Sequence, residues 1–249
     1  MPLGGALLTA EVLLGTVRLP VVLPALACSS LAALTAWVFL PTGPTYTTVP
    51  AYGYAPTELL WALLAGPLIG VAGVVFVRVV GWVSHHRARR WWGLVAPFGA
   101  CVVLGGLGLV YPQLYGNGKD MAEQAFLGEG TTSLFTALAV LKPLVTALCL
   151  GSGMAGGLFT PTLSTGAALG QAWSLLWPGA PAGAYAMLGA AAFIGAATQA
   201  PLAGLVLVLE LTHSGVDLLA PMILATVVAT AVARWIDGYS IYSARLEGR

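Results

Sequence analysis

The sequence predicts an all-α, polytopic membrane protein. Of its 249 residues, 58% are hydrophobic and only 8% are charged, and the mean hydropathy is +0.89, whereas a soluble domain carries about 25% charge. No Asp, Glu, Lys or Arg occurs from Leu19 to Thr57 or from Pro143 to Leu209. One bilayer crossing needs about 20 residues. The second stretch must therefore cross or re-enter the membrane more than once.

Apolar segments separated by Pro, Gly and charged residues set the expected helices. Segments 2–14 and 201–213 would reach only about 20 Å at 1.5 Å per residue, against roughly 30 Å of hydrocarbon. They are expected to be half-helices buried within the protein. The predicted helices cover residues 2–14, 19–40, 57–84, 92–111, 131–150, 158–177, 183–199, 201–213 and 216–236.

The charged and reactive residues fix the orientation and exclude several kinds of site. A basic cluster at the end of the 57–84 helix is expected in the cytoplasm by the positive-inside bias, and residues 41–56 then lie outside; the cluster comprises Arg78, His85, His86, Arg87, Arg89 and Arg90. Adjacent histidines at a helix end do not converge on one ion. The three cysteines are scattered without CxxC spacing, so no metal, cofactor or disulfide framework is expected. A net charge of +1 gives no reason to expect nucleic acid.

An internal repeat links the start of the chain to its end. The spacing P-L-x-G-x5-E occurs at Pro2 to Glu11 and again at Pro201 to Glu210. Such repeats mark transporter folds made of two related halves, whose discontinuous helices form the substrate site. Because the first copy begins at residue 2, the first half is expected to be incomplete. We divide the chain into the remainder of the first repeat with connecting helices, 1–130, and the second repeat, 131–249.

The segment 151–170, GSGMAGGLFTPTLSTGAALG, is the strongest candidate for a site. Gly151, Gly153 and Gly156 fit the dinucleotide pattern G-x-G-x-x-G, but no strand is expected before them and no acid follows until Glu210, so this interpretation fails. Instead the glycines would break one helix and start another near Leu158, whose free N–H groups and positive dipole end can bind an anion. The alternative is that the glycines only permit close helix packing.

The run KPLVTALCLGSGMAGGLFTP, from Lys142 to Pro161, closely resembles the second-half filter motif of the CLC chloride channel and transporter family. The resemblance continues through QAPLAGLVLVLELT at 199–212 and IYSARL at 241–246, the latter similar to the family's final helix, and covers essentially the whole chain. It implies an inverted-repeat helical bundle that transports chloride or a similar small anion. The implied anion site comprises Gly157, Leu158, Phe159, Thr160, Pro161 and Tyr242, with the N–H groups of Leu158 and Phe159 and the Tyr242 hydroxyl as donors.

Two departures from the family pattern carry expectations of their own. The first-half filter serine and the G-K/R-E-G-P loop are absent, so the chain is expected to hold one wall of the pathway and not to conduct alone. Val12 occupies the place of the second of two adjacent acids found in proton-coupled relatives. Because valine cannot carry a proton, a passive, channel-like pathway is expected; the alternatives are a chloride/proton antiporter or a non-functional fragment of one.

The remaining charges at membrane depth leave alternatives open. Glu11 and Glu210 are either functional acids or structural groups at helix ends, and Lys142 either attracts anions or satisfies carbonyl groups at a helix break. An enzyme is not expected, since HExxH and GxSxG are absent. By resemblance the protein is a homodimer with an interface near 19–40, 57–75, 201–213 and 216–236. It is expected in a bacterial plasma or inner membrane.

Overall fold

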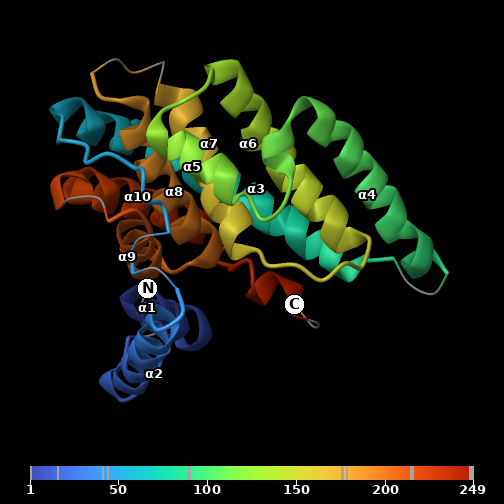
Figure 1. The fold of residues 1–249 in the computed structure, drawn as a ribbon, viewed down its shortest axis with the longest axis horizontal. Helices are drawn as coiled ribbons and strands as arrows, with labels where there is room; N and C mark the ends of the chain where they lie inside the picture. Colours follow the sequence, from blue (N-terminus) through green and yellow to red (C-terminus); the bar gives the residue numbers. More distant parts are fainter. Residues whose placement is uncertain are drawn as a thin grey trace.

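The computed structural model describes the chain apart from residues 1, 16, 41, 44, 89, 90, 175, 176, 178, 214, 215 and 247–249, so Arg89 and Arg90 of the basic cluster lie outside the described residues. Across the described part every regular element is helical, which confirms the all-α prediction (Figure 1). The α-helices are α1 Pro2–Leu8, α2 Leu19–Trp37, α3 Pro56–His85, α4 Trp92–Val110, α5 Lys119–Leu127, α6 Thr132–Gly151, α7 Phe159–Ser174, α8 Ala182–Thr198, α9 Pro201–Thr212 and α10 Leu219–Ile236. Shorter turns are η1 Thr9–Leu13, η2 Pro112–Leu114, η3 Val216–Leu218 and η4 Ser243–Arg245.

Membrane-spanning length separates two kinds of helix. Five helical segments of the described chain are long and apolar enough to cross a bilayer: α2, α3, α4, α6 and Val216–Ile236. The apolar helices α8 and α9 are shorter, and α8 is buried from Gly183 to Thr198. Around α8 pack α7, α10, α3 and α9. The two predicted half-helices are short, as expected, but only α9 is largely buried; in α1, Gly4 and Ala6 are the buried residues.

The closest helix contact, between α7 and α8, depends on glycine. A Cβ at Gly170 would lie 2.1 Å from the Tyr185 carbonyl oxygen, and one at Gly166 would lie 2.6 Å from the Gly189 carbonyl oxygen. Both distances are below any real contact, so a side chain at either position would force the backbones apart. Small residues are the usual means of packing helices in lipid, where apolar side chains gain little by associating. This contact holds α7 against the fully buried helix.

Two segments differ from the sequence-based prediction. Helix α5 was not predicted because it is short and partly polar; it lies between Gly118 and Gly128, whose φ values of +93° and +71° are in the left-handed region that glycine tolerates. The segment 241–246 was expected to be a helix. Among the described residues it forms only the single turn η4.

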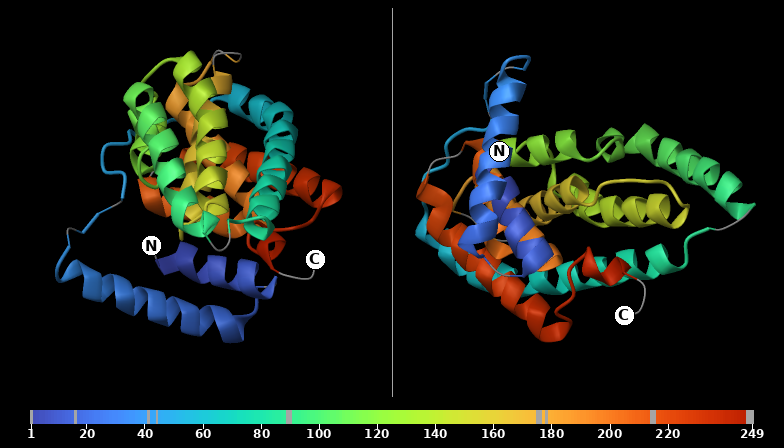
Figure 2. Two further views of the ribbon diagram at one scale, coloured as in Figure 1. Left: turned by 90° about the vertical axis from the view of Figure 1, so that its right-hand side faces the viewer. Right: turned by 90° about the horizontal axis from the view of Figure 1, so that it is seen from below.

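Helices α1 and α2 form one corner of the molecule (Figures 1 and 2). Helix α1 packs between α9 and α2, and the Ser29 hydroxyl of α2 donates to the Pro2 carbonyl oxygen at 2.8 Å. Helix α2 has no buried residue. The attachment of this corner to the bundle therefore depends on α1.

The two copies of the repeat cap each other. The Glu210 carboxylate accepts the N–H groups of Leu3 at 3.0 Å and Gly4 at 2.7 Å, at the start of α1. The Glu11 carboxylate accepts those of Leu202 at 3.3 Å and Ala203 at 2.7 Å, at the start of α9.

The bonded groups occupy equivalent repeat positions, since Leu3 corresponds to Leu202 and Gly4 to Ala203. This exchange supports the repeat, and it supports the structural interpretation of both acids.

We expect Glu210→Ala to lower the melting temperature of the purified chain in detergent. The substitution leaves two N–H groups at the start of α1 without their charged acceptor, at a cost of about 1 to 3 kcal/mol. Glu129→Ala, which removes an exposed carboxylate, is the matched control and should change stability by less than about 0.5 kcal/mol. Equal melting temperatures for the two variants would show that the cap contributes nothing.

Candidate functional site

The candidate site begins where α6 breaks. Helix α6 ends at Gly151, and the Ser152 N–H still donates to the Leu148 carbonyl at 3.0 Å. Gly153 then takes φ of +95°, a conformation that favours glycine. After an irregular stretch, α7 starts at Phe159. The predicted helix break is confirmed, with the new helix beginning one residue after the expected position.

The glycines nearest to α7 are not packing residues. A Cβ added to Gly156 or Gly157 would meet no atom within 4 Å, and both residues are exposed. The close-packing interpretation fits Gly166 and Gly170 instead. At Gly156 and Gly157 the missing side chain leaves the backbone before α7 open.

The start of α7 is held by its own first turn. Leu158 is 3% exposed, and its carbonyl oxygen accepts both the Thr162 N–H at 3.0 Å and the Thr162 hydroxyl at 2.6 Å. No acidic side chain lies in this turn. Within the described chain, the N–H groups of Leu158 and Phe159 donate to no other residue. Two donors at the positive end of a helix dipole are therefore available to a ligand.

Through its side chain, Phe159 links the first turn of α7 to the start of α9. Its half-buried side chain packs on the main core and also on a small cluster formed by Ala200, Ala203 and Leu207, which we call the α9 cluster. Val12 packs against the same cluster. Val12 thus lies in an apolar contact close to the start of α9.

Tyr242 is positioned by the segment after α10. Its half-buried ring packs on the main core, as does Phe159, and the adjacent Ile241 N–H donates to the Ala197 carbonyl of α8 at 2.7 Å. Arg78 Nε donates to Asp237 Oδ2 at 2.6 Å. Leu158, Phe159 and Tyr242 thus belong to the same core cluster, which extends through the bundle, and no hydrogen bond joins Tyr242 to residues 157–161 within the described chain.

The two histidines of the basic cluster contact different carbonyl groups. His85 Nε2 lies 3.1 Å from the Ala244 carbonyl oxygen, and His86 Nδ1 lies 2.9 Å from that of Trp82. They do not converge on a common point, as expected. The contacts that hold the Tyr242 segment, from Arg78 and His85, were not found by sequence reasoning because they join residues about 160 positions apart.

Lys142 is the buried cation of α6. It is 2% exposed, and its ammonium donates to the carbonyl oxygens of Leu114 at 2.9 Å and Gly116 at 3.0 Å. These bonds favour the second of its two interpretations, in which Lys142 satisfies carbonyl groups at a helix break. The open helix end of α7 is thus the better candidate for holding an anion.

Comparisons with known proteins identify the family. The model of the family described as voltage gated chloride channel matches residues 1–234. The chain is 34% identical over 208 residues to the H(+)/Cl(-) exchange transporter ClcA of Vibrio campbellii, covering 79% of this chain and 44% of that protein. Against ClcA of Yersinia pestis bv. Antiqua it is 34% identical over 207 residues, covering 77% and 42%.

Solved structures agree on the fold. A slow cyanobacterial Cl-/H+ antiporter superposes with a TM-score of 0.79 at 22% identity, over 100% of this chain and 62% of that one. A CLC-type fluoride/proton antiporter gives 0.75 at 24% identity, over 96% and 59%. The chain spans less than half the length of the two ClcA proteins. It belongs to the voltage gated chloride channel (CLC) family.

Proposed function

We propose that this chain forms one wall of a transmembrane pathway for chloride or a similar small anion. The single observation that carries the proposal is the uncapped start of α7. The short helices α1 and α9 have their N-termini neutralised by Glu210 and Glu11, whereas α7 begins with open glycines and no acid in its first turn. The proposed anion contacts are Gly157, Leu158, Phe159, Thr160, Pro161 and Tyr242.

A helix end suits transport better than a buried cation. Conduction needs binding that admits the ion and also releases it, and about half a positive charge with two N–H donors provides weak binding. The Tyr242 hydroxyl would add a neutral donor. Lys142 is already engaged with two carbonyl groups. It therefore contributes positive potential without being a direct ligand.

The remaining wall and the partner are part of the same proposal. Because the chain spans less than half of its curated relatives, other polypeptide must complete the pathway. Exposed apolar side chains on α2, α9 and α10, including Leu31, Leu202 and Val227, are available to a second copy in a homodimer. We expect the assembly in the inner membrane of a bacterium.

Two transport modes have support. Relatives at 34% identity are named H(+)/Cl(-) exchange transporters, and this favours proton-coupled exchange as the leading candidate. Val12, packed in the apolar α9 cluster, favours the passive, channel-like mode, since no proton can reside there. The passive mode stays a prediction.

Tyr242→Phe is expected to weaken chloride binding by about tenfold or more, because a hydrogen bond to a charged group contributes about 1.5 to 3 kcal/mol. Isothermal titration of the purified chain in detergent gives the affinity. Tyr239→Phe is the matched control, since Tyr239 is an exposed tyrosine of the same segment. Identical affinities for the two variants, or no chloride binding by the unmodified chain, would remove the site assignment.

Liposomes that contain only this chain should release chloride no faster than protein-free liposomes. The physical reason is that an ion crossing the bilayer on one wall remains exposed to hydrocarbon on the other side. A chloride electrode measures the efflux. Flux above the protein-free level that disappears with Tyr242→Phe would show that these residues suffice.

Where the rest of the pathway is supplied and flux is obtained, a chloride gradient should drive protons against their own gradient. A pH electrode outside the liposomes follows this movement. Val12→Leu should leave the proton-to-chloride ratio unchanged, since neither side chain titrates. Chloride flux without proton movement would assign the passive mode instead.

A further inference from the structure

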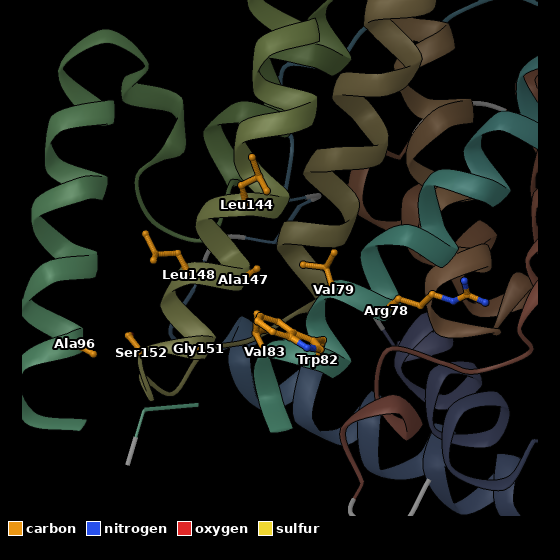
Figure 3. Close-up of a pocket in the computed structure, with 10 residues that line it drawn as sticks. All are labelled: Arg78, Val79, Trp82, Val83, Ala96, Leu144, Ala147, Leu148, Gly151 and Ser152. Atoms are coloured by element: carbon orange, nitrogen blue, oxygen red, sulfur yellow. The ribbon is translucent and has the colours of Figure 1, made fainter. Parts of the chain in front are cut away.

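A large apolar groove lies between three helices at the end where α6 and α3 finish. Its volume is about 720 Å³. Figure 3 shows Ala96 of α4 on one side, Leu148 and Gly151 of α6 in the middle, and Val79, Trp82 and Val83 of α3 on the other side. Among the described residues that line it, Arg78 alone is charged, and its guanidinium points away from the groove toward its partner Asp237. The groove is therefore apolar inside.

A second hollow of about 300 Å³ adjoins the first and shares Val79 and Leu144 with it. Together they follow α3 from Ala72 to Val83, about 17 Å at 1.5 Å per residue. This length matches one leaflet, which is half of a hydrocarbon core of roughly 30 Å. The next hollow along α3, beside Trp61, shares no residue with these two. A transmembrane helix would need the full thickness, so one acyl chain fits better.

The loop after α3 places an exposed arginine near one end of the groove. The loop that joins α3 to α4 is tied to the groove floor, because the Ala88 N–H donates to the Gly151 carbonyl oxygen at 2.8 Å. Arg87 in this loop is exposed. The His86 ring stacks on Trp82 with centroids 4.7 Å apart, which places an indole where the apolar groove meets the basic loop.

One acid, Asp237, pairs with Arg78 beside the groove, but the groove-lining parts of α3, α4 and α6 carry none. The sequence has no Asp or Glu from residue 59 to residue 119, and none in α6. Arginine binds phosphate through charge-assisted, often bidentate hydrogen bonds. Basic residues at the cytoplasmic surface also attract anionic lipid, by about 1 kcal/mol each. The apolar groove thus suits the acyl chain of a lipid, and the loop with Arg87 suits its phosphate.

We propose that the groove binds an anionic phospholipid of the cytoplasmic leaflet. One acyl chain lies between α3, α4 and α6, and the phosphate lies at the loop that carries Arg87. The lipid would contact Gly151 and Ser152, where the segment leading to Gly157 begins. It would therefore brace the end of α6 from which the candidate anion site departs.

The test uses the full-length protein chain in nanodiscs. One sample contains a trace of phosphatidylglycerol with a photoreactive acyl chain, and the other contains a trace of phosphatidylcholine with the same photoreactive group. Mass spectrometry locates the labelled peptides. We expect phosphatidylglycerol to label the groove-lining parts of α3, α4 and α6 at least fivefold more than the far end of α4, where Leu109 and Val110 are exposed and do not line the groove. Phosphatidylcholine should show a smaller preference. Uniform labelling, or equal preference for the two lipids, would overturn the proposal.

Two variants separate the acyl groove from the basic loop. Ala96→Phe fills the groove from α4 and should lower groove labelling at least threefold, whereas Val102→Phe, at an exposed position of α4 that does not line the groove, should not. Arg87→Gln, at an exposed loop position, should reduce phosphatidylglycerol labelling to the phosphatidylcholine level even if Ala96→Phe misfolds. Unchanged labelling in Arg87→Gln would contradict the role of the headgroup. Neither readout depends on anion transport, so failure here leaves the proposed function untouched.

Discussion

Inside a bilayer, each backbone N–H and C=O group needs a partner from the protein, and the other features of this structure depend on that constraint. Helices that begin at membrane depth leave donors free. Glu210 and Glu11 supply acceptors for α1 and α9, and Lys142 supplies donors to the carbonyl groups of Leu114 and Gly116. The start of α7 has no acid in its first turn, which is why we propose that an anion binds there.

The position of that helix end follows from how α7 packs. Gly166 and Gly170 let the α7 backbone lie directly on α8, which is buried along nearly its whole length. A helix so fixed cannot move its first turn without moving the core. The Ala197 carbonyl of the same helix α8 accepts the Ile241 N–H. The segment that carries Tyr242 is therefore anchored to α8 as well. The two parts of the proposed anion site are thus held by a common support.

The two copies of the repeat join the start of the chain to α9. Each glutamate stabilises the helix of the other copy, so α1 and α9 are joined by charge as well as by apolar contact. Val12 and Phe159 both touch the α9 cluster, which connects this joint to the start of α7. Val12 brings no titratable group to this contact, and its side chain is part of the apolar packing.

The sequence by itself determined the membrane class, the helix boundaries to within about three residues and the break after Gly151, because these depend on hydropathy, glycine and local periodicity. The candidate donors came from the family resemblance and stay a prediction. It left open the roles of Glu11, Glu210 and Lys142, and it missed α5 and the pairing of Arg78 with Asp237. Only the tertiary structure decided these, since each depends on a partner far away in the chain. Whether an intramembrane charge is free or satisfied depends on which backbone groups folding brings to it, and no local pattern records that.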